Sequence, residues 1–435
     1  MADMAAKPYR NWRGQELTCM PPPCQPHLTP FNSHFLCIPS DTKQSLDRKT
    51  IQAVMPQLTA ENIEVQLKAA LSAPPPTRLS PSHYKPKPQP FYVYDDAKGT
   101  WIEETASDAS ASTTTGSPSA QGEPKGDSFR LLTWNIDCLI PFGEQRMAAA
   151  LAYLETLIGK STTTPTTTGS SSSSNDSIPA VIFFQEMTPD DLALILAAPW
   201  IQQRFYITER DNTNWGTPYY GTVTLVDRKL SIVEVFRIPF VSRFGRDGFY
   251  VNIRLASLPS GEDDGGDGGG SDAPLSSSPS AVLQLCNAHL ESLIADPPIR
   301  PLQLEDAAKQ LHAVRAGLVA GDLNAIQPFD RTIAEENNLK DVYLELGGKE
   351  DSDEGYTWGI QVPEWLRKKF GPSRMDKVLY CGALQAIRIE RIGVGVTVSD
   401  EDVKKEMREK GIGEWVTDHY GLMAEMRLVG ARFGG

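Results

Sequence analysis

The stretch "VAGDLNAI", residues 319–326, holds the feature on which the interpretation of this chain depends. A short apolar run ends at Gly321 and Asp322, and an amide, Asn324, follows two positions after the acid. An acid and an amide at this spacing usually form an ordinary Asx turn. They gain a chemical meaning only if other strands end in polar groups that reach the same place.

The composition is that of an acidic protein with a full-sized core. The chain has 435 residues, 40% of them hydrophobic, with a net charge of −13 and a pI near 5.1. This balance argues against a broadly basic nucleic-acid coat, although 42 lysines and arginines can still form a local basic groove. Six cysteines without paired spacing in the folded part fit a reducing compartment.

No targeting or membrane segment is expected. No apolar run approaches the about 20 residues of a membrane helix, and the N-terminal stretch "MADMAAKPYRNWRG" lacks the apolar region of a secretory signal. We therefore expect a soluble intracellular protein with no membrane partner.

The N-terminal part predicts little folded structure. Residues 1–90 are rich in proline and predict a mostly disordered extension with short helices at most. Residues 91–128 predict a small hairpin in "PFYVYDDAKGTWIEE" followed by a Ser/Thr/Gly linker. One cluster in the extension could suit zinc, but its proline-rich, unpaired spacing favours a disordered tether. That cluster contains Cys19, Cys24, His27, His34 and Cys37.

Residues 129–435 predict a single α/β catalytic domain. Short apolar runs such as "AVIFF" and "FYVNIRL" alternate with helical patterns and also follow one another directly, which is typical of mixed sheets. Low-complexity tracts at about 160–178 and 259–280 are predicted to be loop insertions, because apolar strands resume on both sides and loop lengthening costs little. Without them the domain has roughly 270 residues, a reasonable single-domain size.

Six apolar segments of this domain carry a polar residue at one end. Each residue alone has an ordinary explanation, such as a turn, a helix N-terminal acid or a surface ion pair. Their repeated occurrence favours a shared cleft at one rim of a sheet, since burying such groups is unfavourable unless they pair or bind a ligand. The residues are Asn135, Glu186, His289, Asp322, Asp376 and the pair Asp418–His419.

These groups suit metal-assisted phosphodiester hydrolysis. One carboxylate with an amide nearby suits a hard cation such as Mg²⁺, with Mn²⁺ as a substitute, and the region lacks a zinc-type Cys/His cluster. Asp322 and Asn324 could hold and polarise a water molecule. A histidine paired with an acid, His419, could stabilise charge that develops on a phosphate.

The order of the motifs resembles that of a known family. "TWNID", "QEM", "HLES", "GDLN", "RMDKV" and "TDHYGL" are similar, in this order, to motifs of the endonuclease/exonuclease/phosphatase superfamily. Within it, "LLTWNID", "NAHLES" and "YTWGIQ" resemble the 5′-tyrosyl-DNA phosphodiesterases, which cleave the bond between a topoisomerase tyrosine and a DNA 5′ phosphate. The resemblance covers about residues 129–428. It implies a four-layer αββα sandwich of two mixed sheets.

The resemblance also implies a role for each catalytic position. Glu186 is similar to the metal carboxylate, and Asn135 lines the same pocket. Asp322 is similar to the acid that activates water, and Asn324 to the amide that orients that water. The remaining roles concern the phosphate: His289 and His419 contact it, Ser292 lies beside it, Asp376 orients His419, and Asp418 supports the metal or water network.

The substrate side of the resemblance is defined by fewer residues. Tyr219 matches a tyrosine that faces the phosphate, with Tyr220 as the adjacent alternative, and Trp358 matches an aromatic that stacks on the DNA end. Arg243 and Arg246 are both candidates for the arginine of the substrate groove. The basic stretch "WLRKKFGPSR" (365–374) is a candidate for DNA backbone contacts.

Two motifs depart from the family pattern. Thr417 stands where the family usually has serine, which keeps the hydroxyl group. Leu323 stands where threonine is frequent, and Ala325 and Ile326 follow where an arginine is often close.

The expected function is therefore Mg²⁺-dependent hydrolysis of 5′-phosphotyrosyl bonds in DNA repair. The expected partners are DNA 5′ ends that carry tyrosyl or peptide adducts, including topoisomerase II remnants, bound by a monomer in the nucleus and also in the cytoplasm. The alternatives are another superfamily enzyme (an abasic-site endonuclease, a deadenylase or a phosphoinositide phosphatase) and a non-catalytic scaffold that keeps only the fold.

Overall fold

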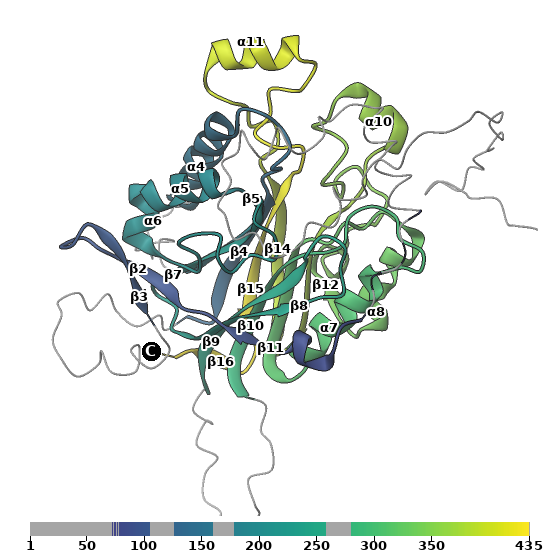
Figure 1. The fold of residues 1–435 in the computed structure, drawn as a ribbon. Helices are drawn as coiled ribbons and strands as arrows, with labels where there is room; N and C mark the ends of the chain where they lie inside the picture. Colours follow the sequence, from purple (N-terminus) through teal and green to yellow (C-terminus); the bar gives the residue numbers. More distant parts are fainter. Residues whose placement is uncertain are drawn as a thin grey trace, which may run out of the picture.

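The computed structural model describes residues 78–104, 126–159, 178–257 and 280–434, with the single positions 72, 74 and 76. The N-terminal Cys/His cluster, most of the predicted linker and nearly all of the two predicted insertions lie outside the described residues. The described chain forms two stacked, mixed eight-stranded sheets, which are seen edge-on in Figure 1.

The first sheet runs in the order β1-β8-β9-β10-β11-β13-β12, and β16 pairs with β9. Its strands are β1 (Lys87–Pro88), β8 (Ile232–Pro239), β9 (Asp247–Ser257), β10 (Ser280–His289), β11 (Val314–Asp322), β12 (Lys340–Asp341), β13 (Asp376–Gly382) and β16 (Ala431–Phe433).

The second sheet runs in the order β14-β15-β4-β5-β7-β6-β2-β3. Its strands are β2 (Phe91–Asp95), β3 (Thr100–Glu104), β4 (Ser128–Asn135), β5 (Ala180–Met187), β6 (Phe205–Ile207), β7 (Gly221–Asp227), β14 (Leu384–Ile392) and β15 (Gly421–Leu428).

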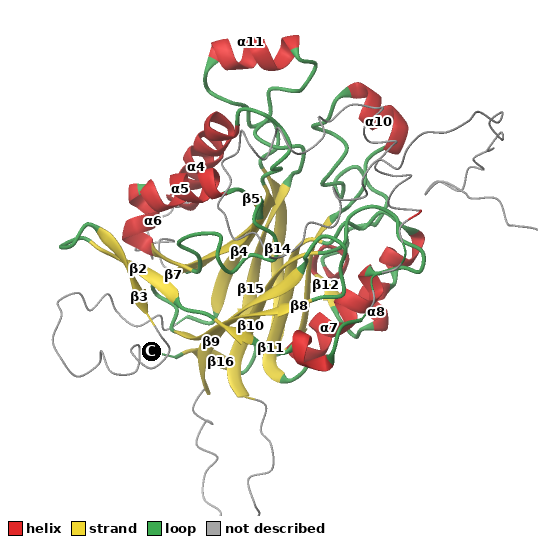
Figure 2. Cartoon of the chain, in the orientation of Figure 1, coloured by secondary structure: helices red, strands yellow, loops and turns green. Residues whose placement is uncertain are grey.

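The helices lie on the outer faces of the two sheets and in the loops above them (Figure 2). None of the helices in the described part of the chain is both long and apolar enough to cross a membrane. The α-helices are α4 (Gly143–Gly159), α5 (Pro189–Ala197), α6 (Pro199–Arg204), α7 (Arg300–Leu311), α8 (Ile333–Glu336), α9 (Val342–Glu345), α10 (Glu364–Phe370) and α11 (Glu401–Glu409), and the short 3-10 helices are η2 (Pro81–Tyr84) and η5 (Pro328–Arg331).

Alternation along the strands explains the four layers. In β4, Phe129 and Leu131 point into the core between the sheets, while Leu132 and Trp134 point to the opposite face, where α4 and α5 pack. The other sheet is covered in the same way by α7, through a third core that includes Leu304 and Leu311. Sheets buried on both faces require the near-continuous apolar runs seen in the sequence. The αββα prediction is confirmed.

The predicted hairpin forms as the antiparallel pair β2–β3, and β2 also pairs with β6 at the edge of the second sheet. Residues just before it are also packed: β1 pairs with β8, and the Gln89 side-chain amide donates to the Thr208 carbonyl at 2.9 Å. Residues 87–89, at the end of the predicted N-terminal extension, therefore belong to an edge of the domain. The organisation predicted for the rest of residues 1–90 stays a prediction.

A buried charge cluster anchors the segment before β13. Arg374 pairs with Asp341 at 2.8 Å and with Glu350, and Lys377 pairs with Glu350 at 3.0 Å. Burial opposes ionisation of Glu350, but Lys377 and Arg374 outweigh it and hold the pKa of Glu350 below its usual value. Arg374 is therefore engaged inside the protein, which corrects its assignment to the DNA-contacting basic stretch.

This cluster predicts a pH-dependent loss of stability. Glu350→Gln should lower the free energy of unfolding by about 2 kcal/mol at neutral pH, because Lys377 then loses the partner of its buried charge. A carboxylate with a lowered pKa stabilises the fold above its unfolded pKa and loses that effect as the pH falls through its folded pKa. Urea unfolding at neutral and at acidic pH should therefore show the difference between the two proteins shrinking in acid. The same change at exposed Glu364, which pairs with Lys368, should leave unfolding unaltered. A difference that does not vary with pH would contradict the electrostatic origin.

Candidate active site

The sheets bring the predicted polar strand ends to one rim. Asn135 ends β4, and His289 and Asp322 end the parallel strands β10 and β11, where they are register partners. Asp376 begins the antiparallel strand β13 and is the partner of Asp322 on its other side. His419 lies in the turn just before β15. Residues that are far apart in the sequence are therefore neighbours because of strand pairing.

Asp322 lies at the centre of this group and is 2% exposed. Asn135 Nδ2 donates to its Oδ2 at 3.0 Å, and the Asn324 backbone N–H donates to its Oδ1 at 2.8 Å. Burial alone would raise the pKa of Asp322, but the nearby His419 and His289, together with the Asn324 N–H, hold the pKa well below its usual value. Asp322 is therefore ionised at neutral pH.

The backbone of "GDLN" is fixed by close contact with β10. Gly321 has φ +145°, and a Cβ at this position would lie 1.8 Å from the Ala288 carbonyl oxygen. Asn324 has φ +49°, a conformation that asparagine tolerates. Leu323 is 3% exposed and belongs to the core under α7. Leucine at the position where threonine is frequent therefore serves the core.

His289 is held in one tautomer. Arg246 Nη1 lies 2.8 Å from His289 Nδ1, and because a guanidinium can only donate, Nδ1 must accept and Nε2 must carry the proton. Burial and the positive charge of Arg246 lower the pKa of His289, which favours this neutral form. Nε2 is buried without a hydrogen bond and lies 3.4 Å from Asp322 Oδ2. Arg246 also donates to Ser292 Oγ at 2.8 Å.

His419 is held in the protonated form. Its Nδ1 lies 2.8 Å from Asp376 Oδ2, and its Nε2 lies 3.9 Å from Asp322 Oδ2 and 3.8 Å from Asp418 Oδ1. Burial lowers the pKa of His419, but the three acids outweigh burial and raise the pKa well above its ordinary value. Trp358 Nε1 donates to Asp418 Oδ2 at 2.7 Å, which fixes the position of the Asp418 carboxylate.

Glu186 adds a carboxylate in a strained conformation. Its φ is +56°, which is uncommon for a residue other than glycine, and strained residues of this kind cluster at functional sites. The Cys138 N–H donates to Oε2 at 3.1 Å, and Oε1 lies 3.7 Å from His289 Nε2. Burial opposes ionisation, but His289 and Arg246 hold the pKa of Glu186 below its usual value.

The site offers two overlapping sets of metal-ligand atoms. Within each set the atoms lie within 4.8 Å of one another: Glu186, His289 and Asp322 in one, and Asp322, Asp376 and His419 in the other. In the tautomer and protonation states derived above, both histidines present N–H groups rather than lone pairs. The available ligands are therefore carboxylate oxygens, which fit a hard divalent cation.

Comparison with known proteins identifies the family of this chain. The model of the Endonuclease/Exonuclease/phosphatase family matches residues 132–419. The chain belongs to this family. No curated protein sequence matches the chain.

Solved structures with a similar fold include TDP2 from two organisms. TDP2 from D. rerio, complexed with single strand DNA product, is 15% identical with a TM-score of 0.46, over 69% of this chain and 99% of that chain. Truncated TDP2 from Caenorhabditis elegans is 18% identical with a TM-score of 0.46, over 69% of this chain and 97% of that chain.

The structure distinguishes between the predicted substrate-side residues of this family member. Arg246, not Arg243, contacts His289; the Arg243 backbone N–H donates to Glu291 Oε1 at 3.0 Å and so helps to hold the loop. Tyr220, rather than Tyr219, reaches the site: its ring lies 6.5 Å from that of His289 and 5.2 Å from the guanidinium of Arg246. These distances support Tyr220, the adjacent alternative, while the role of Tyr219 stays a prediction.

Sequence reasoning missed two residues that shape this family site. Asp137 is 6% exposed, and burial together with the charge of Asp418 raises the pKa of Asp137 to about 8. Arg146 on α4 is fully buried and donates to the carbonyls of Ile136 at 2.6 Å and Val416 at 2.7 Å, which joins the loop after β4 to the turn before His419. Asp137 was visible in "TWNID", whereas an arginine on a helix ordinarily indicates a solvated face.

The His419–Asp376 pair predicts a measurable titration. In the parent protein the His419 imidazole should stay protonated above neutral pH, because Asp376 stabilises the cation. In Asp376→Asn its pKa should fall towards the ordinary histidine value of about 6.5, since the closest negative charge is lost. NMR titration of the imidazole signals checks this shift. The matched change Asp351→Asn, at an exposed acid that pairs with Arg331, should leave the His419 titration unaltered. An unchanged His419 titration in Asp376→Asn would contradict this account.

Proposed function

We propose that this family member is a Mg²⁺-dependent phosphodiesterase that hydrolyses the bond between a tyrosine and a DNA 5′ phosphate. One observation carries the proposal: two ionised carboxylates, Asp322 and Glu186, share a buried site with two histidine N–H groups. Negative groups that can hold a cation and a water molecule therefore lie beside N–H donors, one neutral and one cationic, that can hold a phosphate. A scaffold that only keeps the fold would have no use for this costly arrangement of buried charges.

The chain's own groups account for the attack on phosphorus. Ionised Asp322 accepts a hydrogen bond from the attacking water, while Asn324 and Asn135 fix the carboxylate through their donated hydrogen bonds. The oxygen of the water forms a new bond to phosphorus as one of its protons passes by way of Asp322 to solvent. The bond from phosphorus to the tyrosine oxygen breaks, so that the phenolate leaves and takes a proton from solvent. The products are a DNA 5′ phosphate and a free tyrosine.

Charge stabilisation is the larger requirement of this reaction. A tyrosine phenol has a pKa of about 10 and leaves more readily than an alcohol. Protonating the leaving oxygen is therefore less important than stabilising the charge on the phosphate oxygens. His289 Nε2–H and the protonated His419 supply that stabilisation from two sides. A cation held by Glu186, with Asn135 beside it, would add Lewis-acid polarisation of the phosphate when bound.

The tyrosyl-DNA specificity is supported by the motifs "NAHLES" and "YTWGIQ" and by the half-buried Trp358, whose indole is fixed by Asp418 at the edge of the site. Topoisomerase-derived tyrosyl and peptide adducts on DNA are the corresponding substrates, and the nucleus is the corresponding place of action. Mn²⁺ would serve as a substitute ion.

A direct competition test addresses the substrate. The protein is incubated with Mg²⁺ and a 5′-phosphotyrosyl single-stranded oligonucleotide, and in parallel with an abasic duplex, an adenylate tail and a phosphoinositide. Release of tyrosine should be the fastest reaction. Cleavage of one of the other substrates while the phosphotyrosyl oligonucleotide stays intact would overturn the specific assignment and retain only the family.

Removing either carboxylate should abolish catalysis without unfolding the protein. Glu186→Gln and Asp322→Asn keep side-chain size, and each should lower kcat by at least about a hundredfold, because an ionised group that orients the cation or the water is lost. Activity assays and thermal melting are measured on the same preparations. Near-normal rates in both folded variants would refute the mechanism.

Metal dependence has a readout that does not involve turnover. Chelation should stop tyrosine release, and added Mg²⁺ should restore it. Mg²⁺ should also raise the Tm of the parent protein, because a ligand that binds only the folded state stabilises it. Glu186→Gln should show a smaller rise in Tm. An equal rise in both proteins would place the ion elsewhere.

A further inference from the structure

Residues 357–361, with the sequence "TWGIQ", lie beside the turn at residues 417–420 that carries His419. Trp358 and His419 form an isolated antiparallel bridge, and the Tyr420 backbone N–H donates to the Thr357 carbonyl at 2.7 Å. This bridge lies outside the strands of the two sheets. The catalytic turn is therefore supported by a second backbone segment in addition to β15.

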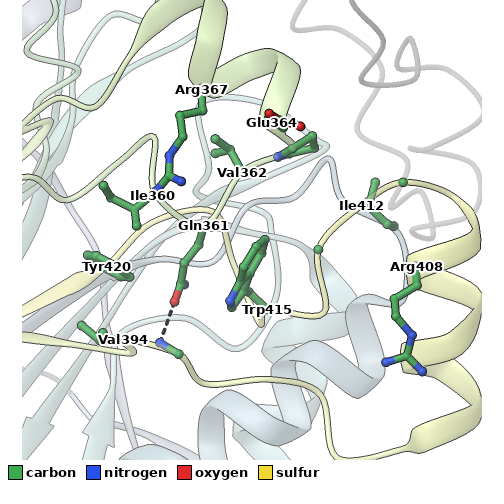
Figure 3. A pocket seen from close by; sticks show the side chains of 14 residues that line it. Ile360, Gln361, Val362, Glu364, Arg367, Val394, Arg408, Ile412, Trp415 and Tyr420 are labelled. Atoms are coloured by element: carbon green, nitrogen blue, oxygen red, sulfur yellow. Dashed lines mark hydrogen bonds between the residues drawn. The ribbon is translucent and has the colours of Figure 1, made fainter.

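Gln361 holds the start of this turn from the side of the cavity shown in Figure 3. Its buried Nε2 donates to the Thr417 carbonyl at 3.2 Å, and its Oε1 accepts from the Gly395 N–H at 2.6 Å, the bond drawn in the figure. The Thr417 hydroxyl donates to the Asn135 carbonyl at 2.8 Å and accepts from the His419 N–H at 3.2 Å. Gln361 therefore fixes the residue that sets the backbone of His419.

Thr357 holds the acid that pairs with this histidine. It is 1% exposed, and its Oγ1 accepts from the Asp376 backbone N–H at 3.0 Å. Its carbonyl binds the turn just after His419, through the Tyr420 N–H described above. The two sides of the 2.8 Å contact between His419 Nδ1 and Asp376 Oδ2 therefore share one support.

The supporting segment is itself fixed against the residues before β13. The backbone N–H groups of Thr357 and Trp358 both donate to the Ser373 carbonyl at 3.0 Å, and the Ser373 N–H donates to the Trp358 carbonyl at 3.1 Å. Gly359 has φ +88°, and a Cβ at this position would lie 2.7 Å from the Gly371 carbonyl oxygen. Close packing on this side therefore leaves the segment little freedom to move with the turn.

We propose that Thr357 and Gln361 are positioning residues, which hold Asp376 and His419 in place for the phosphate. The inference rests on the proposed function and adds two residues that act only through the groups they hold. A cationic donor stabilises developing charge only at the correct distance, and a displacement of about 1 Å can cost about a hundredfold in rate. A segment that served stability alone would leave the rate of the folded protein unchanged.

Thr357→Val keeps the shape of the side chain and removes the acceptor of the Asp376 N–H. With p-nitrophenyl thymidine 5′-phosphate, a phosphodiester whose leaving group is a phenol, kcat should fall about tenfold and KM should change less than about twofold. Thr357→Ser keeps the hydroxyl and should recover most of the loss. Buried Thr208 is the matched control, because its Oγ1 accepts from the Thr224 N–H at 3.0 Å. Thr208→Val should lower Tm to a similar degree with kcat unaltered, and equal kcat values for the two valine variants would overturn the proposal.

A second measurement needs no turnover. The His419 Nδ1–H that is bonded to Asp376 should give a downfield proton signal in the NMR spectrum, identified by its loss in Asp376→Asn. Gln361→Met, which keeps side-chain length but makes neither hydrogen bond, should shift or broaden this signal, as should Thr357→Val, whereas Thr208→Val should not. An unchanged signal in both variants of the segment would refute the positioning role. If the parent protein does not cleave the nitrophenyl ester, the proposed function fails, and the NMR signal alone decides the positioning role.

Discussion

The burial of the Asp322 carboxylate is the constraint on which the site depends. A charge removed from water must be compensated, and here strand register supplies the compensating groups. His289, the register partner of Asp322 on β10, places its Nε2 3.4 Å from the carboxylate, and Asp376, the partner on β13, holds the protonated His419 beside it. Asn135 from the second sheet adds a direct hydrogen bond across the sandwich. The same contact that offsets the cost of burial also ties the two sheets together at the catalytic rim.

The two histidines are different because their partners are different. Arg246 makes His289 neutral with its proton on Nε2, while Asp376 keeps His419 charged through Nδ1. Both therefore direct an N–H group towards the region beside Asp322. Arg246 and Asp376 thus give two similar imidazoles different charges: His289 is a neutral N–H donor and His419 is a cationic one, and both can bind the phosphate of the proposed substrate.

The sequence predicted that polar residues at the strand ends would meet at one site, but it did not predict which loop side chains point towards that site. The residues at strand ends meet because apolar runs fix the strands and sheet closure aligns their ends. The sequence pattern could not distinguish Tyr220 from Tyr219 or Arg246 from Arg243. Tyr220 and Arg246 lie beside His289 because of the path of the backbone in irregular loops, which no sequence pattern sets. Arg374 was expected to face DNA and instead lies in an ion cluster, because its burial depends on acids distant in the sequence.

The net charge of −13 is compatible with a DNA substrate because recognition depends on local charge rather than the total. Some surface acids are also paired within the chain, as Glu364 is with Lys368 on α10. For the substrate proposed above, attraction must therefore come from cations inside the site, such as Arg246 and the protonated His419, rather than from the surface as a whole.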